Sequence, residues 1–337
     1  MPASPFPVVT GLAPRLALLW LLVAGAGFAA LALGAQDYPA GAVWQALRGG
    51  QDPTLAILRE MRVPRAGAAV LVGAALAVAG LMMQALTRNP LADPGLTGVN
   101  AGAALAVVAG LYCAGPLAPA GLAGLALLGA AGAAVLVRGL AGAGDTTLRL
   151  PLAGAAFSSL CMAIVALVVL LNPEARGVYR FWMVGSLSMA DVAMLAWMAP
   201  LAGFGLGLAL LVARQIEALG LGAELAGALG VHPARAAAGA LLAITCLAGA
   251  SVALAGPVGF VGLIAPHLAR WVLPKAAGLA AQVLAAAPLG ALVTLLADLA
   301  GRRLPRPAEL PLGIVLALIG APVFMALVRR MLRAGAA

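Results

Sequence analysis

The sequence predicts an all-α integral membrane protein with about ten transmembrane helices, and three observations lead to that prediction. First, 64% of the 337 residues are hydrophobic and only 9% are charged. Second, the mean hydropathy is +1.08. Third, apolar stretches of about twenty residues, the length that crosses a bilayer, follow one another along the chain. No soluble domain can bury so much apolar surface, so the solvent of this protein must be lipid.

The apolar stretches are joined by short polar connections. The longest connection, from Gln36 to Arg65, is shorter than an ordinary domain. We therefore expect a single transmembrane domain over residues 1–337. The eighth stretch is short and is not expected to cross the bilayer fully, and an even number of spans places both termini on one side. The expected spans are 16–35, 66–86, 95–114, 117–139, 150–172, 191–213, 236–255, 258–272, 277–300 and 310–329.

The first stretch has an alternative interpretation as a signal peptide. Arg15 precedes it, and the small residues near 31–35 resemble a cleavage site. The apolar run is about twenty residues long, however, and signal sequences have shorter apolar regions. Its length favours a retained span, with cleavage as the alternative.

The second stretch ends in a polar segment rich in helix breakers, which we call the Asn-Pro turn: Arg88-Asn89-Pro90-Leu91-Ala92-Asp93-Pro94. Such a segment cannot face lipid unless protein or water satisfies its backbone. We therefore expect it to have a function. A second broken segment, Gly256 to Gly262, predicts a tight turn or a half-helix for the same reason.

Two sequence echoes indicate an internal repeat. The segment 73–80 reads GAALAVAG and the segment 249–256 reads GASVALAG, with five of eight positions identical. Leu-Pro-Leu opens both the fifth span, at 150–152, and the tenth, at 310–312. Both echoes are displaced by five spans, and an odd displacement inverts the second unit, as in many transporters. The echoes suggest a five-plus-five inverted pseudo-repeat.

The distribution of cations favours cytoplasmic termini by a small margin. With that orientation eleven Arg and Lys side chains lie inside and nine outside. The many outward arginines would be explained by an acidic partner that docks there. On the inner side, the amphipathic loop 214–235 is broken by glycines. It is either an interfacial helix on lipid headgroups or a docking site that presents Leu221, Leu229 and Val231 to a cytoplasmic partner.

Most other functions are disfavoured. The chain has no phosphate loop, so another chain would have to hydrolyse any ATP. Its two histidines, His232 and His267, lack metal-ligand partners at helical spacing, and the three cysteines lack metal spacing, so neither metal nor cofactor is expected. No soluble basic stripe for nucleic acid is present.

Two rival functions remain open. Ser186 with His267 could imitate an intramembrane serine hydrolase, although nothing in the sequence orients the histidine. An ion-coupled secondary transporter would need carboxylates in mid-span. Asp298 instead lies near a span end, four residues before Arg302, which predicts a local salt bridge.

A set of short motifs follows in a fixed order, and together they are specific. They are RVPR at 62–65, VGAALAVAG at 72–80 with Gln84, RNPLADPG at 88–95, LAG at 152–154, Phe181-Trp182 through Gly185-Ser186-Leu187, AGPVGFVGL at 255–263 with Pro266-His267, Leu296-Ala297-Asp298, Glu309-Leu310-Pro311 and IGAP at 319–322. From about Asp52 to Arg330 the chain thus resembles the permease subunits of type II ABC importers. That family brings ferric siderophores, haem and cobalamin across the bacterial inner membrane.

The resemblance implies a ten-span protomer without enzymatic activity. It implies a dimer with a second copy of the permease, or with a paralogous permease, and alternating access at the dimer interface. It also implies two cytoplasmic ATPase subunits and a periplasmic binding protein. Matched residue by residue, Arg62 and Arg302 would pair with acidic residues of the binding protein. The cytoplasmic gates would be formed by Asn89, Leu91, Thr147 and Leu148, and the ATPase coupling contacts by Gly222, Glu224, Leu229, Gly230 and Val231.

Within this family the chain looks most like ferric-siderophore permeases, with haem and cobalamin as alternatives. The segments 87–103, 171–173 and 180–182 carry that likeness. One departure stands out: after Trp271 the family usually has a Gly-x-Asp-His-Arg run, whereas this chain has LPKAA at 273–277.

Overall fold

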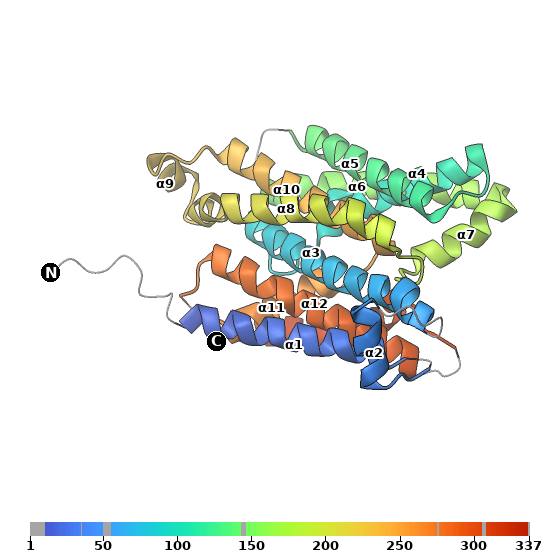
Figure 1. Cartoon of the computed structure of the whole chain (residues 1–337). Coiled ribbons are helices and arrows are strands. Elements are labelled where there is room, and N and C mark those ends of the chain that lie inside the picture. Colours follow the sequence, from blue (N-terminus) through green and yellow to red (C-terminus); the bar gives the residue numbers. More distant parts are fainter. Residues whose placement is uncertain are drawn as a thin grey trace.

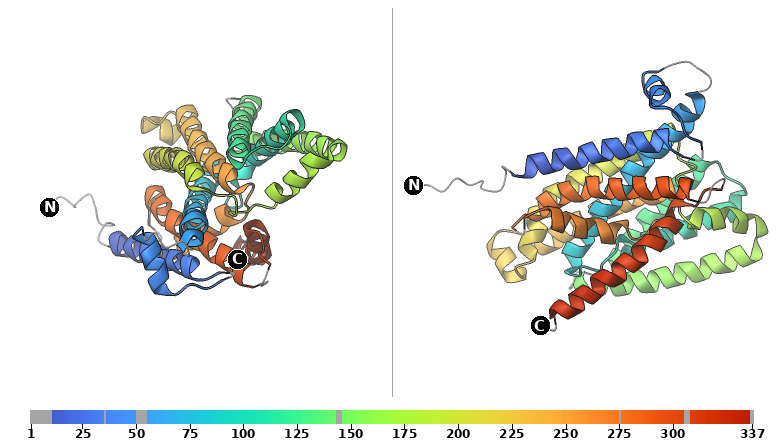
Figure 2. Two further views of the ribbon diagram at one scale, coloured as in Figure 1. Left: turned by 45° about the vertical axis from the view of Figure 1, so that its right-hand side comes forward. Right: turned by 90° about the horizontal axis from the view of Figure 1, so that it is seen from below.

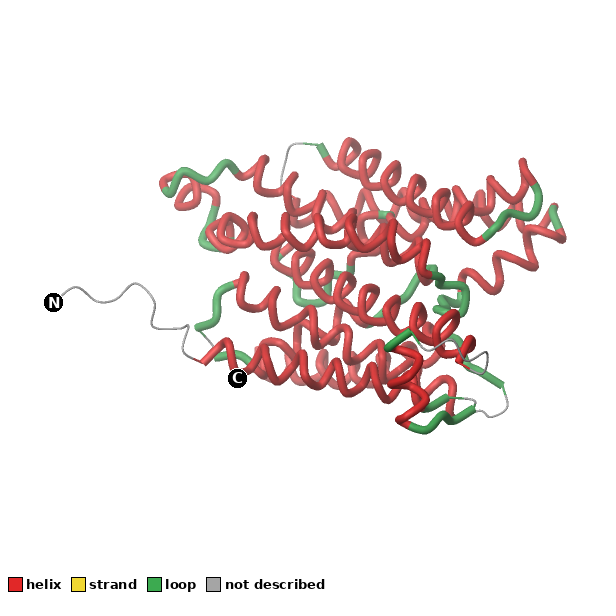
Figure 3. The backbone as a smooth tube through the Cα atoms, viewed as in Figure 1, coloured by secondary structure: helices red, strands yellow, loops and turns green. Residues whose placement is uncertain are grey.

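The computed structural model describes residues 11–34, 36–49, 55–142, 146–274, 276–304 and 308–335, and the regular structure in these ranges is entirely helical (Figures 1 and 3). The helices are α1 (Leu12–Ala32), α2 (Ala40–Leu47), the π-helical turn η3 (Ile57–Arg62), α3 (Val63–Thr87), the 3₁₀ turn η4 (Pro94–Thr97), α4 (Val99–Ala114), α5 (Pro119–Ala141), α6 (Thr146–Leu171), α7 (Pro173–Met183), α8 (Val192–Leu219), α9 (Ala223–Ala228), α10 (Pro233–Ala255), α11 (Val261–Val272), α12 (Leu279–Arg303) and α13 (Leu312–Gly335).

The long helices lie side by side and define two ends of the bundle (Figures 1 and 2). One end, here the α9 end, holds α9, the start of α1 and the end of α13. The other, here the α7 end, holds α2 and α7. The start of α1 and the end of α13 thus lie at the same end, which agrees with an even number of spans.

Each of the ten expected spans coincides with one helix. Within the described ranges, seven helices are long and apolar enough to cross a membrane. Helix α4 and the segment Leu312–Ala326 of α13 are shorter apolar helices. The eighth span is α11, with only 12 residues, as the sequence predicts. The short helices α2 and α7 were not predicted, because neither has the length or the continuous apolar run that marks a span.

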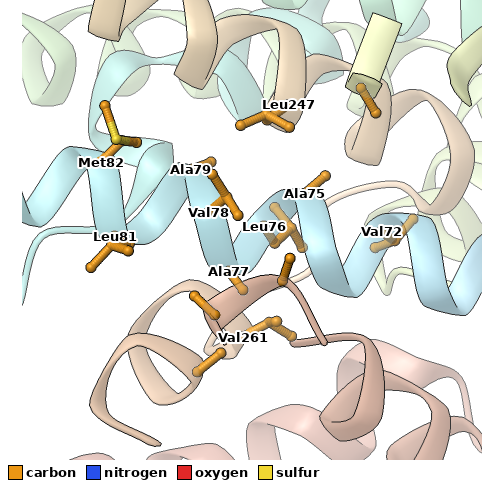
Figure 4. Packing of buried hydrophobic residues seen from close by; sticks show 14 of the residues in the cluster. Val72, Ala75, Leu76, Ala77, Val78, Ala79, Leu81, Met82, Leu247 and Val261 are labelled. Atoms are coloured by element: carbon orange, nitrogen blue, oxygen red, sulfur yellow. The ribbon is translucent and has the colours of Figure 1, made fainter. Parts of the chain in front are cut away.

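The centre of the bundle is built on α3 and α10, whose apolar windows are the most buried. Side chains from all around α3 are enclosed: Leu247 of α10 lies on one side of it and Val261 of α11 on another (Figure 4). Small residues let the backbones approach. A Cβ on Gly80 would stand 2.1 Å from the Gly262 carbonyl oxygen, so α3 and α11 touch backbone to backbone.

The two halves of the chain share one order of elements: a central helix, a break in the helix and then a further helix. Helix α3 ends in the Asn-Pro turn, followed by η4 and α4, whereas α10 ends in residues 256–260, followed by the short α11. Helices α3 and α10 run in opposite directions, because α3 ends and α10 begins at the α9 end (Figure 1). This arrangement agrees with the predicted inverted pseudo-repeat, and 256–262 forms the predicted turn and half-helix.

Candidate functional site

The Asn-Pro turn satisfies its backbone with its own side chains. Arg88 ends α3 in the left-handed conformation, at φ 52°. Asn89 Oδ1 then accepts from Leu91 N at 2.9 Å, and Asp93 Oδ1 accepts from Gly95 N at 2.8 Å. Desolvation raises the pKa of the Asp93 carboxyl, and the Gly95 hydrogen bond opposes that rise. The turn is therefore a folded unit that can lie beside lipid-spanning helices.

Helix α6 packs directly on η4, the 3₁₀ turn that follows the Asn-Pro turn. A Cβ on Gly154 would stand 1.7 Å from the Leu96 carbonyl oxygen, so only glycine allows the contact. The expected gate residues Asn89 and Leu91 lie in the turn, the first exposed and the second half-buried. Thr147 and Leu148 lie in the first turn of α6, and their side chains are outside the described residues. The two expected gates thus belong to segments that the contact between η4 and α6 joins.

The loop between α8 and α10 forms a projecting knuckle built around α9. Gly222 at φ 111° and Gly230 at φ 78° turn the chain before and after this helix. Within α9 Ala226 is fully buried, while Leu225 and the C-cap residue Leu229 are 60% and 65% exposed, next to the exposed Glu224. An anchored short helix therefore presents leucines outward at the α9 end (Figure 1).

Not every residue of the expected docking knuckle points outward. Leu221 is exposed like Leu225 and Leu229. Val231 instead is half-buried and packs against the main core, and its N–H donates to the Ala226 carbonyl at 2.9 Å. Val231 thus ties the knuckle to the bundle.

At the α7 end, two arginines bind the C-terminus of α1. Arg62 donates to the Leu31 carbonyl at 2.7 Å and to the Gln36 carbonyl, and it stacks 4.7 Å over the Tyr38 ring. Arg302 donates to the Ala30 carbonyl at 3.0 Å. The last carbonyls of a helix lack partners within it and favour cations, and the last turn of α1 has no basic residue of its own. Both arginines are buried in this role.

The predicted salt bridge between Asp298 and Arg302 is confirmed, and it belongs to a larger network. Arg302 Nε lies 3.0 Å from Asp298 Oδ2, while Arg65 of α3 lies 2.9 Å from Asp298 Oδ1 and 2.7 Å from Glu309 Oε2. Arg65 and Glu309 were not predicted as members of this network, although they lie in the motifs 62–65 and 309–311. Sequence spacing shows pairs on one helix but not pairs between helices.

Asp298→Asn is expected to destabilise the protein by about 2 kcal/mol, because it leaves the buried Arg302 and the half-buried Arg65 without their shared carboxylate. The control is Arg303→Gln, which breaks the exposed Arg303–Asp37 pair at 3.3 Å. Exposed pairs contribute less than about 1 kcal/mol. Thermal unfolding of both variants in one detergent measures the difference, and equal melting temperatures would show that Asp298 has no such role.

A polar cluster joins α3 to α11 near the α9 end. Gln84 Nε2 donates to the Gly262 carbonyl at 3.1 Å, and Arg270 Nη2 donates to Gln84 Oε1 at 3.0 Å. His267 Nδ1 lies 2.8 Å from the Leu263 carbonyl and 3.2 Å from Arg270 Nη2. The imidazole therefore belongs to this cluster.

The structure gives no support to a hydrolytic pair. Ser186 Oγ is 3.0 Å from Ser188 Oγ, in the turn after α7 at the α7 end, and no hydrogen bond among the described residues links it to His267. Ser186 instead belongs to a tight junction. Its N–H donates to the Ala255 carbonyl at 2.8 Å, and Gly313 N donates to the Gly185 carbonyl at 3.0 Å. Two of the quoted motifs, 181–187 and 255–263, thus meet near the start of α13.

Sequence comparison decides the family. The model of the FecCD transport family matches residues 20–330. The chain belongs to the FecCD transport family. The permease is 40% identical over 325 residues to the ferric enterobactin transport system permease protein FepD of Escherichia coli (strain K12), covering 95% of each chain. It is 38% identical over 291 residues to the hemin transport system permease protein HmuU of Yersinia pestis, covering 80% of this chain and 82% of that protein.

The permease also matches a solved structure reported as an inward-facing conformation of a metal-chelate type ABC transporter. The TM-score is 0.83 at 28% identity, over 95% of this chain and 99% of that one. The predicted fold and the predicted class of protein are therefore confirmed: a multi-pass membrane permease of an ABC importer and not an enzyme. Membership implies ATPase and binding-protein partners.

Proposed function

We propose that this permease carries ferric siderophores across the bacterial inner membrane, by alternating access at the interface of a homodimer. The observation that carries the proposal is the exposed, anchored α9 knuckle on a transport permease that has no phosphate loop of its own. Such a chain needs a separate ATPase subunit, and α9 is the surface on which that subunit would dock. Several of its relatives are named for the transport of ferric enterobactin or of a siderophore, which supports this class of cargo.

Coupling runs through the loop 214–235 of the single domain 1–337. Gly222 and Gly230 set the turns of the knuckle, Glu224 and Leu229 lie on its outer surface, and Val231 fastens it to the core. A rigid knuckle transmits the displacement of an ATPase subunit to α8 and α10. The α9 end is then cytoplasmic and both termini are inside.

The gate proposal follows from the contact between α6 and η4, which directly continues the Asn-Pro turn. Asn89 and Leu91 lie in the Asn-Pro turn, whereas Thr147 and Leu148 lie in the first turn of α6. Movement of α8 and α10 against α3 would therefore displace both pairs of gate residues. Leu91 is only half-buried, so an apolar side chain is available to close an aqueous path.

The α7 end would receive the periplasmic binding protein. Arg62 and Arg302 are buried on the α1 carbonyls, so we propose that they act by holding the loop after α1 in its docking position. Arg303, which is 40% exposed beside them, could reach a carboxylate on the partner directly. The direct contact expected from the sequence thus becomes a supporting role for the two buried arginines.

Reconstitution in proteoliposomes tests the proposal. The permease with its ATPase, its binding protein and ATP should import ⁵⁵Fe-loaded siderophore, whereas the permease alone should import nothing. The control is the full set with a non-hydrolysable ATP analogue. Energised uptake by the solitary permease would contradict the proposal, and uptake of haem in preference to siderophore would reassign the cargo.

A further inference from the structure

Two cavities lie one after the other along the bundle, and residues of α3, α8 and α12 line both of them; together they are called the groove. Figure 1 shows α3 between α8 and α12. One, of about 350 Å³, lies at the α9 end, and the other, of about 170 Å³, lies deeper in the bundle.

The cavity at the α9 end is basic. Arg88 and Arg270 line it, with Gln84, Gln282 and Glu217 as its other polar side chains. The Glu217 carboxylate faces the N-terminus of α12, where Leu279 N lies 3.4 Å from Oε2. Among the described residues, no carboxylate forms an ion pair with Arg88 or Arg270. Their hydrogen-bond partners are neutral: the Leu219 carbonyl for Arg88, and Gln84 and His267 for Arg270.

The deeper cavity is lined by apolar residues alone, most of them small: Ala74 and Ala75 of α3, Ala199, Ala202 and Gly203 of α8, and Ala287 of α12. Ala287 lies eight residues after the first residue of α12, which is about 12 Å along the helix. A Cβ on Gly203 would meet nothing within 4 Å, so the groove is open there. Because the hydrocarbon core is about 30 Å thick, a position about 12 Å inside a membrane-spanning helix is expected to lie within it.

We propose that this groove binds one glycerophospholipid with an anionic headgroup, taken from the leaflet at the α9 end. The phosphate would lie between Arg88 and Arg270 in the basic cavity, and one acyl chain would lie along the small-residue cavity. Basic pockets between helices at a membrane face suit such headgroups. A soluble anion would explain only the first cavity, and an ATPase subunit could not reach the second. The inference does not depend on the cargo or on the proposed docking contacts.

The test uses the full chain, purified in detergent and depleted of lipid, with native mass spectrometry as the readout. Dioleoyl phosphatidylglycerol should bind about tenfold more tightly than dioleoyl phosphatidylcholine, and millimolar inorganic phosphate should not displace it. Arg88→Gln should weaken the phosphatidylglycerol adduct about tenfold, because a charge-assisted contact is lost. Arg214→Gln is the matched control. It removes an exposed charge from α8 near the α9 end of the bundle, and Arg214 does not line the cavity.

A second pair of variants tests the acyl-chain cavity and does not alter charge. Gly203→Phe fills this cavity and should also weaken the adduct about tenfold. Gly207→Phe, at an exposed glycine of α8 that does not line the cavity, should leave it unchanged. Equal binding of both lipids, equal losses in Arg88→Gln and Arg214→Gln, or full binding by Gly203→Phe would each overturn the proposal. Displacement by phosphate would overturn it in favour of a simple anion site.

Discussion

ATP-driven uptake is expected to fall to background when Leu225 and Leu229 are both replaced by serine. These side chains are 60% and 65% exposed on α9, so they contribute almost nothing to the packing of the permease itself. Burying one leucine at an interface contributes roughly 1.5 to 3 kcal/mol. Loss of two would weaken ATPase binding by a factor on the order of 10² to 10⁴.

Co-purification of the ATPase subunit with the variant, and uptake in reconstituted liposomes, measure this effect. The matched control replaces Leu136 and Leu140 by serine. These leucines are 57% and 68% exposed on the last turns of α5, away from the knuckle. The control should keep ATPase binding and uptake. Normal ATPase binding by the α9 variant would show that the motor docks elsewhere.

Gly73→Leu is expected to prevent recovery of folded permease. A Cβ on Gly73 would stand 2.3 Å from the Gly290 carbonyl oxygen, and a Cβ on Gly290 would stand 2.1 Å from the Gly73 carbonyl oxygen. Helices α3 and α12 therefore touch through their backbones. In lipid, close packing of small residues replaces the hydrophobic drive for helix association. Separating the pair should cost more than about 3 kcal/mol.

Size-exclusion profiles and thermal unfolding in detergent check this expectation. Gly132→Leu on α5 is the control, because a Cβ there would meet nothing within 4 Å. It introduces the same side chain into a span at a glycine that faces outward, and it should behave as the unmodified protein. If both variants showed the same melting temperature, the α3–α12 contact would not limit stability.

Much of the fold could be predicted because lipid imposes a simple rule on sequence. Every span must hide its backbone polar groups in a helix and show apolar side chains to lipid. Apolar runs such as 66–86 and 236–255 can therefore be recognised in the sequence, and they form most of α3 and α10. Helices α2 and α7 escaped prediction because they do not span, so the rule does not apply to them.

The site was less predictable than the fold. The motifs pointed to the right segments, and α9 does present Leu225 and Leu229 outward. Burial, however, depends on what packs above a residue. Arg62 and Arg302 were expected to face a partner, and they instead bind the carbonyls that end α1. Val231 was expected on the surface and packs inward.

The sequence by itself determined the class of molecule, the number of spans and the position of the breaks, because hydropathy and helix-breaking residues act locally along the chain. Only the tertiary structure decided which partners meet across helices. Arg65 forms ion pairs with Asp298 and Glu309, which are more than two hundred residues away in the sequence. Residues of α3, α8 and α12 together line a basic cavity and, next to it, an apolar one. Those relations depend on the approach of helix backbones in three dimensions, which small residues permit but do not specify.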